Sequence, residues 1–203
     1  MTKYVAVILA GGKVTNINKN EMPAALEFMG DKTAIMWQIG LLEEHVDRII
    51  IACGNLKDQI EKHLEKECLK CSVPIEFSVE EKLLGTAGAL KKAAELIDKD
   101  TDFVIVNNVD DITNVDLFAL KNIKKNVICI ANPRLPFGVV KLDEGEGIIE
   151  EFKEKPIINN IWVSCGVYML KFKDLKKILP DEGSLERDVF PFMEELRVYK
   201  HKG

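Results

Sequence analysis

Long hydrophobic runs are absent from this sequence of 203 residues. No apolar stretch approaches the roughly 20 residues that a helix needs to cross a bilayer. A charged leader followed by a cleavage site is absent as well, because the apolar run Tyr4–Ala10 is short and leads directly into two glycines. We therefore expect a cytoplasmic protein that does not associate with membranes.

Blocks of like charge, internal repeats and low-complexity linkers are also absent. The net charge of −5 is modest, and Lys and Glu alternate along the chain, so no long-range attraction to nucleic acid is expected. A chain of 203 residues suffices for one large α/β domain and is short for two. We expect a single domain that spans residues 1–203.

Cysteine is sparse and odd in number. The five cysteines are Cys53, Cys68, Cys71, Cys129 and Cys165. Three of them lie in apolar, strand-like runs, which indicates buried thiols in a reducing compartment rather than a disulfide framework. Cys68 and Cys71, with His63 upstream, could supply three metal ligands, but a structural zinc site normally has four. We interpret this segment as a helix end and a loop.

Strands and helices alternate regularly up to about residue 125. Continuous apolar runs rich in β-branched residues predict strands buried on both faces. These runs span 4–10, 48–53 and 103–107, and the segment 74–79 is also predicted to be a strand. Apolar residues at helical spacing predict helices at 33–46, 56–66, 87–97 and 115–123. This order predicts a parallel sheet with right-handed crossovers and helices on both faces, whereas the stretch 11–32 is polar and irregular.

The pattern changes after residue 125. Strand-like segments then follow one another with turn residues between them, which predicts antiparallel pairing and hairpins. They span 126–132, 137–142, 148–154 and 162–170. Helices at 172–179 and 185–196 and a short strand at 198–200 follow. We expect a three-layer α/β/α, Rossmann-like fold whose mixed, mostly parallel sheet has an antiparallel β extension in the second half.

In open α/β sheets, ligands bind beyond the carboxyl ends of the strands. The first such loop contains Gly11 and Gly12, whose lack of a Cβ lets the backbone approach a phosphate or a base. A structural turn is an equally good interpretation, and the run matches neither the P-loop nor the Rossmann glycine pattern.

Two further loops follow buried strands. The loop Glu80–Leu90 places small residues at a helix start, where a flat ring can lie on the backbone and negative charge is favoured. Its glycines could instead let the helix pack closely on the sheet. The next loop contains Asp110 and Asp111, and a carboxylate there can hold a divalent cation against a ligand phosphate. Either residue could instead cap the turn or the following helix.

In this order, the segments resemble the sugar-phosphate nucleotidyltransferases, also called NDP-sugar pyrophosphorylases. The resemblance covers nearly the whole chain, and the run Leu84–Leu90 is very specific for the family. The matching segments are Ala6–Gly12, Leu84–Leu90, Asn108–Asp110, Phe137–Val140, Phe152–Pro156, Cys165–Tyr168 and Glu186–Pro191.

The resemblance implies that a sugar 1-phosphate attacks the α-phosphorus of a nucleoside triphosphate and releases pyrophosphate. Residues 1–125 would form the nucleotide-binding half and residues 126–203 the sugar-binding half. The implied nucleotide-binding residues are Ala10, Gly11, Gly12, Glu80 and Gly85, and the implied sugar-binding residues are Gly138, Glu154 and Lys155. Asp110 would hold the cofactor Mg²⁺. Relatives commonly form homo-oligomers, which is therefore an expectation for this chain.

The phosphate loop departs from the family pattern. The family has Gly-Gly-x-Gly-Thr-Arg, whereas this chain reads GGKVTN from Gly11 to Asn16, and the family's Pro-Lys is replaced by Pro23–Ala24. Two cations that would contact the triphosphate are therefore missing. Lys13 and Lys19 could replace part of this charge, which makes Lys13 a catalytic candidate beside Asp110, although a loop lysine is more often only solvated. The family's second metal-binding Asp, in a Trp-x-Asp segment, would follow Gly203.

Two functions are compatible with these features. The retained Asp110, Glu154 and Lys155 favour an active sugar-1-phosphate nucleotidyltransferase. The changes at Asn16 and Ala24 favour a catalytically impaired member that binds nucleotide sugars as a regulatory or partner subunit.

Overall fold

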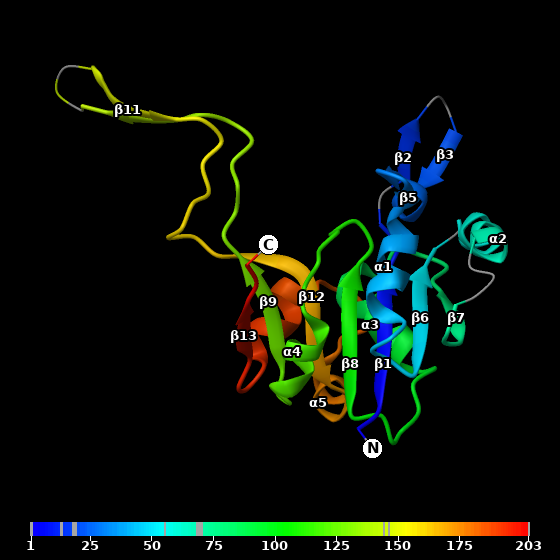
Figure 1. Cartoon of the computed structure of the whole chain (residues 1–203). Coiled ribbons are helices and arrows are strands. Elements are labelled where there is room, and N and C mark those ends of the chain that lie inside the picture. The colour runs from blue at the N-terminus through cyan, green and yellow to red at the C-terminus, as the bar shows by residue number, and fades with distance from the viewer. Residues whose placement is uncertain are drawn as a thin grey trace.

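The computed structural model describes residues 2–12, 14–17, 20–54, 56–67, 71–143, 145 and 147–202. Its centre is a seven-stranded sheet in the order β13-β9-β12-β8-β1-β6-β7 (Figure 1). The strands are β1 (Tyr4–Leu9), β6 (Arg48–Cys53), β7 (Ile75–Val79), β8 (Phe103–Asn108), β9 (Val127–Ala131), β12 (Val163–Lys171) and β13 (Arg197–Lys200). Within this sheet β12 alone is reversed, because it pairs antiparallel with both β8 and β9 while the remaining neighbours are parallel.

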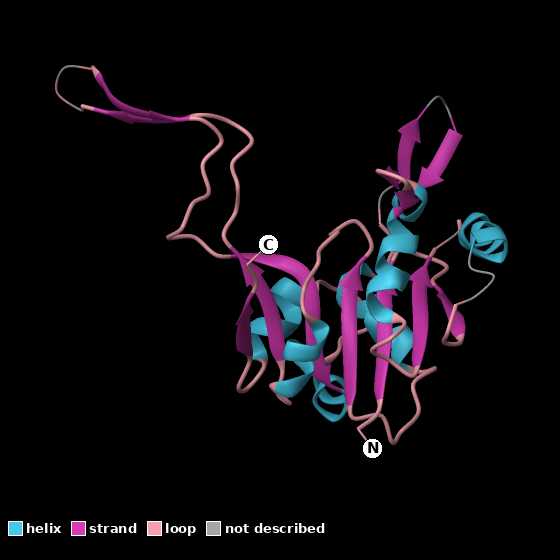
Figure 2. Ribbon diagram, viewed as in Figure 1, coloured by secondary structure: helices cyan, strands magenta, loops and turns pink. Residues whose placement is uncertain are grey.

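Helices cover both faces of the sheet (Figure 2). Side chains of β1 alternate between the faces, so Ala6 and Ile8 join one apolar core while Val5 and Val7 join the other. The first core contains residues of α1 (Ala34–Leu42), α2 (Lys57–Glu67) and α4 (Leu117–Asn122), and the second contains residues of α3 (Gly85–Ala94) and α5 (Phe172–Ile178). The predicted three-layer α/β/α fold with a mixed, mostly parallel sheet is confirmed.

Two segments differ from the prediction. Residues 11–32, expected to be irregular, contain the hairpins β2 (Val14–Ile17)–β3 (Asn20–Pro23) and β4 (Phe28–Met29)–β5 (Lys32–Thr33), with the 3₁₀ turn η1 (Ala24–Leu26) between them. The continuous helix expected at 185–196 is wrong. A π turn, η2 (Leu185–Val189), and a 3₁₀ turn, η3 (Phe190–Phe192), stand there instead, because Pro191 has no N–H to extend a helix.

Residues 133–162 leave the sheet as an arm. The arm ends in the hairpin β10 (Val139–Leu142)–β11 (Ile149–Lys153), which lies well away from the sheet (Figure 1). Its base is fixed by Asn132, whose Nδ2 donates to the Ile161 carbonyl at 2.7 Å. Phe137 and Phe152 on the arm are 75% and 61% exposed. An isolated two-stranded hairpin is marginally stable at best, so the contacts at its base matter for its position.

The cysteines follow the expectation in part. Cys53 and Cys129 are buried free thiols, and burial raises the pKa of Cys53 to about 11 and that of Cys129 to about 12. Cys165 is also free and is half-buried. Cys71 is instead disulfide-bonded, contrary to the expected thiol, and Cys68 lies outside the described residues. The structure contains no helix of the length and apolarity that a bilayer crossing requires, within the residues it describes.

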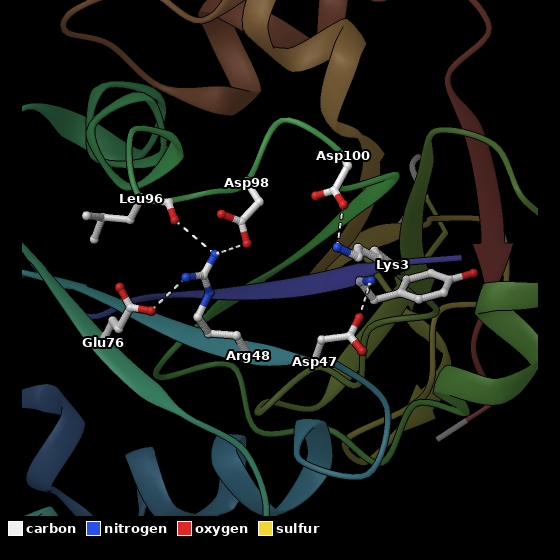
Figure 3. Close-up of polar contacts among 8 residues, drawn as sticks. Lys3, Asp47, Arg48, Glu76, Leu96, Asp98 and Asp100 are labelled. Carbon is white, nitrogen blue, oxygen red and sulfur yellow. Dashed lines mark hydrogen bonds and ion pairs between the residues drawn. The ribbon is translucent and has the colours of Figure 1, made fainter. Parts of the chain in front are cut away.

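Arg48, at the start of β6, forms hydrogen bonds with three acceptors at the edge of the sheet opposite the predicted site (Figure 3). Its Nη1 donates to Glu76 Oε1 on β7 at 2.8 Å. Its Nη2 donates to the Leu96 carbonyl at 3.0 Å and to Asp98 Oδ2 at 3.2 Å. The Arg48 side chain is only 19% exposed, so these bonds are partly shielded from water. Lys3 forms a separate, more exposed ion pair with Asp100 in the same region.

Replacing Arg48 by Met is expected to lower the free energy of unfolding by about 1–3 kcal/mol, because the part-buried bond to Glu76 and two more exposed bonds are lost together. Urea denaturation measures this change. Lys3→Met is the matched control, since it removes an exposed ion pair and should cost less. Equal losses in the two variants would contradict the importance assigned to Arg48.

Candidate functional site

A cavity of about 420 Å³ opens at the carboxyl ends of β1 and β8. This is the edge at which open α/β sheets bind ligands. The cavity is lined by Leu9, Gly11, Gly12, Glu80, Leu83, Gly85, Thr86, Ala89, Asn108 and Asp110. The structure therefore brings together Asp110 and four of the five residues predicted to bind the nucleotide. The fifth, Ala10, is buried beside them, and its N–H donates to the Ala52 carbonyl at 2.7 Å.

Glu80 is a buried carboxylate on the wall of this cavity, with 5% of its surface exposed. Its N–H donates to the Cys53 carbonyl at 2.9 Å, and its Oε2 accepts from the Leu84 N–H at 3.1 Å. A Cβ at Gly11 would lie 2.4 Å from Glu80 Oε1. Glycine at position 11 therefore leaves room for the carboxylate, which keeps further acceptor capacity for a ligand.

The glycines at the start of α3 have a packing role as well. Gly85 has φ +73°, and a Cβ on it would lie 2.3 Å from the Gly183 carbonyl oxygen. A Cβ on Gly88 would lie 2.4 Å from the Asp181 carbonyl oxygen. The Ala87 N–H of α3 donates to the Gly183 carbonyl at 3.0 Å, and the Gly183 N–H donates to the carbonyl of Leu84, directly before α3, at 2.9 Å. The close approach is to the loop 181–183 rather than to the sheet, and Gly85 also lines the cavity.

Asp110 and Asp111 have different surroundings. Neither caps α4. The N-cap of that helix is Asp116, whose Oδ1 accepts from the Ala119 N–H at 2.9 Å. Asp111 Oδ2 accepts from Asn108 Nδ2 at 2.9 Å. A Cβ at Gly166 would lie 2.0 Å from that same oxygen, so the glycine of β12 makes space for Asp111. Asp110 is exposed and lines the cavity.

Sequence reasoning missed two buried amides beneath this loop. Gln38 on α1 and Asn107 on β8 are 1% and 0% exposed, and Asn107 Nδ2 donates to Gln38 Oε1 at 2.9 Å. Gln38 Nε2 donates to the carbonyls of Asn108 and Asp111, each at 3.0 Å. The helical pattern offered a signal, because Gln38 lies four residues after Ala34 and four before Leu42, both of which are buried.

The predicted sugar-binding residues cluster with one another but not with the cavity. Lys155 Nζ lies 3.9 Å from Glu154 Oε1. A Cβ at Gly138 would lie 3.1 Å from Glu154 Oε2 and 2.5 Å from a ring carbon of Phe152. All three residues flank the hairpin β10–β11 of the arm, which stands apart from the sheet (Figure 1). Their role in sugar binding stays a prediction.

The altered phosphate loop, residues 11–16, follows β1 in the chain. Lys13 and Lys19 lie outside the described residues. Asn16 belongs to β2, and Ala24 begins the turn η1 that follows β3. The hairpin β2–β3 extends from the same edge of the sheet as the cavity (Figure 1). A cation introduced on this hairpin would therefore be added on the ligand side of the sheet.

A second cavity of about 400 Å³ adjoins the first and shares Asp110 with it. It is lined by Asp110, Asp111, Ile112, Thr113, Asn114, Ala131, Cys165 and His201. His201 follows β13, and its Nε2 lies 3.0 Å from Asn114 Oδ1. Asp110 therefore lies on the wall of both cavities.

Asp110 places one exposed carboxylate on the cavity wall, and carboxylate oxygens are ligands of the kind that Mg²⁺ takes. Within the residues that the structure describes, no group of three or more His, Cys, Asp or Glu side chains is arranged as a metal cage. Mg²⁺ does not require one, because it is commonly held by one or two carboxylates, substrate phosphates and water. Asp110 can supply one such carboxylate.

The family model for nucleotidyl transferases matches residues 5–194. The chain belongs to this family. The resemblance to sugar-phosphate nucleotidyltransferases that the motifs predicted is thereby confirmed.

Named relatives point the same way. A mannose-1-phosphate guanyltransferase of Schizosaccharomyces pombe is 32% identical over 201 residues, which cover 93% of this chain and 55% of that protein. The mannose-1-phosphate guanylyltransferase catalytic subunit beta of Xenopus tropicalis is 28% identical over 199 residues, with coverage of 93% and 55%. The chain thus spans about half the length of the curated relatives it matches.

Solved structures share the fold. HddC from Yersinia pseudotuberculosis complexed with GMP-PN has a TM-score of 0.74 at 23% identity, with 98% of this chain and 90% of that chain covered. UDP-glucose pyrophosphorylase complexed with UDP-glucose has a TM-score of 0.60 at 19% identity, with coverage of 88% and 79%.

Proposed function

We propose that this chain is a sugar-1-phosphate nucleotidyltransferase that transfers GMP from GTP to a sugar 1-phosphate and releases pyrophosphate. The observation that carries the proposal is the cavity in which Gly11, Glu80, Gly85 and Asp110 meet at the carboxyl edge of the sheet. It combines a buried carboxylate at one part of its wall with an exposed one at another. A nucleotide requires this separation of base recognition from phosphate handling.

Glu80 supports guanine as the base. Guanine presents two adjacent donors, the ring N1–H and the 2-amino group, and a carboxylate presents two adjacent acceptors. Glu80 is buried and borders the cavity, so its unpaired acceptor capacity would favour a base with matching donors. The guanylyltransferase names of the relatives agree with this choice.

The chemistry requires positioning and charge neutralisation rather than a base. An anionic phosphate oxygen of the sugar 1-phosphate forms a bond to the α-phosphorus of GTP, and the bond from that phosphorus to the β-phosphate oxygen breaks. When bound, Mg²⁺ supplies positive charge to the phosphate oxygens. Asp110, between the two cavities, would hold that charge where the acceptor and the nucleotide meet.

A binding subunit without turnover is the second candidate. The observation that favours it is the absence of Arg at position 16 and Lys at position 24, where this chain has Asn16 and Ala24. A single preorganised group that stabilises developing charge is typically worth about 10²–10³ in rate. Such a protein would retain the base pocket around Glu80 and bind GTP or a nucleotide sugar.

Pyrophosphate release in Mg²⁺, with a panel of nucleoside triphosphates and sugar 1-phosphates, separates the two candidates. The first predicts turnover that is highest with GTP and that falls to background in Asp110→Ala. The second predicts no turnover above that control while isothermal titration still detects GTP or GDP-sugar binding. Absence of both turnover and guanine-nucleotide binding would refute both candidates.

A further inference from the structure

The loop that carries Asp110 is held from below by one side-chain amide. Gln38 Nε2 donates to the Asn108 carbonyl on one side of Asp110 and to the Asp111 carbonyl on the other. A third carbonyl, that of Val109, lies at 3.5 Å. These bonds connect residues that are 70 and 73 positions apart in the sequence. Gln38 therefore acts as a bridge across the loop from helix α1.

The second amide fixes the orientation of the first. Asn107 donates from Nδ2 to Gln38 Oε1, so the Gln38 amide is aligned with its nitrogen toward the loop carbonyls. Asn107 pairs in register with Ile8 of β1 and Val167 of β12, in the middle of an apolar sheet. Its Oδ1 has no hydrogen-bond partner among the described residues. A buried polar pair with an unpaired oxygen is costly where apolar side chains would pack, and such exceptions concentrate at functional sites.

Asp110 depends on this backbone for its position. Its carboxylate forms no hydrogen bond or ion pair with any residue that the structure describes, whereas Asp111 beside it is held by Asn108. The Val109 N–H donates to the Leu9 carbonyl at 3.2 Å, which ties the same loop to the end of β1. The location of the Asp110 side chain is thus set by the main chain on either side of it.

We propose that Gln38 is a positioning residue that fixes the 108–111 backbone so that Asp110 meets a divalent cation bound to the nucleotide phosphates. This proposal rests on the metal role of Asp110 in the proposed function. Groups that orient a metal ligand from behind typically change metal affinity or activity about 10–100-fold when they are lost. Gln38 is not among the residues that line the cavity, so its effect passes through the loop.

The test compares GTP affinity in saturating Mg²⁺ with GTP affinity in EDTA, measured by isothermal titration without a sugar 1-phosphate. The dissociation constant in EDTA divided by that in Mg²⁺ reports how much the metal strengthens GTP binding, and this quotient is called the Mg²⁺ ratio. Gln38→Met removes the amide while keeping a side chain of similar length. It is expected to reduce this ratio about 10-fold and to leave the affinity in EDTA unchanged, because Glu80 and Gly11 are not altered. If Gln38→Met does not fold, Gln38→Leu serves instead, because it also removes the N–H donors and adds no buried charge.

Asn126→Leu is the matched control. Asn126 is another buried amide, 4% exposed, whose Nδ2 donates to Asp174 Oδ2 at 3.0 Å and whose Oδ1 accepts from the Lys171 N–H at 2.7 Å. It is remote from Asp110, because it directly precedes β9 at the opposite edge of the sheet. A merely structural role for Gln38 predicts that both variants lose stability and that neither changes the Mg²⁺ ratio. Hydrogen exchange at Val109 and Asp111 supplies an independent readout, with faster exchange expected in the Gln38 variant alone.

The outcomes separate this proposal from the function on which it rests. An Asp110→Ala variant with an unchanged ratio overturns the metal role of Asp110 and, with it, the role given to Gln38. A reduced ratio in Asp110→Ala together with an unchanged ratio in the Gln38 variant overturns the positioning role alone. A reduced ratio in both, with Asn126→Leu unchanged, supports the proposal.

Discussion

Replacing Asn16 by Arg together with Ala24 by Lys is expected to raise the rate of pyrophosphate release from GTP and a sugar 1-phosphate by at least about 10²-fold. An arginine that stabilises charge during phosphoryl transfer can be worth about 10³–10⁵ in kcat, and a lysine adds a second positive charge. Asn16 lies on the hairpin β2–β3 and Ala24 begins the turn after it. Both positions are where the family resemblance expects contacts with the triphosphate.

The control for this gain keeps the side-chain size and omits the charge. Asn16→Gln with Ala24→Met lengthens both side chains and should leave the rate near that of the natural chain. A matching gain in this neutral variant would show that size, rather than charge, limits the reaction. If neither variant gains while GTP still binds, the missing cations are not the cause of low activity, and the binding-subunit candidate is favoured.

The positions of the nucleotide loops could be predicted because local patterns determine them. The apolar run Tyr4–Ala10 indicated a buried strand, and buried strands followed by glycine or small residues placed the loops at one edge. Parallel pairing of β1 with β6 and β8 then brings Gly11 and Asp110 into one cavity. Each strand and each loop is recognised from residues within a few positions of one another, although the pairing of the strands is not local.

The remaining features depend on contacts that are distant in the sequence. Gln38 and the loop at Asn108 meet only after α1 packs on the sheet, and a glutamine in a predicted helix is ordinarily placed in solvent. For the arm, the sequence predicted a function but not a position. The motif around Glu154 predicted sugar binding, but the extended connections that flank the hairpin decide where it lies in the structure (Figure 1). No periodicity in the sequence encodes that direction.

Glu80→Gln is expected to raise the dissociation constant of GTP by about 10–100-fold, because a bidentate contact to a base is worth about 1–3 kcal/mol. The amide offers one acceptor and one donor, so its N–H₂ would face a donor of guanine. The Glu80 side chain is buried, and water cannot readily substitute for the lost acceptor. Glu81→Gln is the matched control, since it removes the same charge from an exposed neighbour and should leave the dissociation constant unchanged.

Inosine triphosphate tests the geometry of this contact, because it lacks only the 2-amino group of GTP. The natural chain should bind it more weakly than GTP, since one of the two donors that Glu80 would accept is missing. In Glu80→Gln the difference between the two nucleotides should shrink, because the matching acceptor is gone. Isothermal titration of both proteins with both nucleotides measures this coupling. An undiminished preference for GTP in Glu80→Gln would assign guanine recognition to other groups in the cavity, such as the backbone of Gly11 and Gly85.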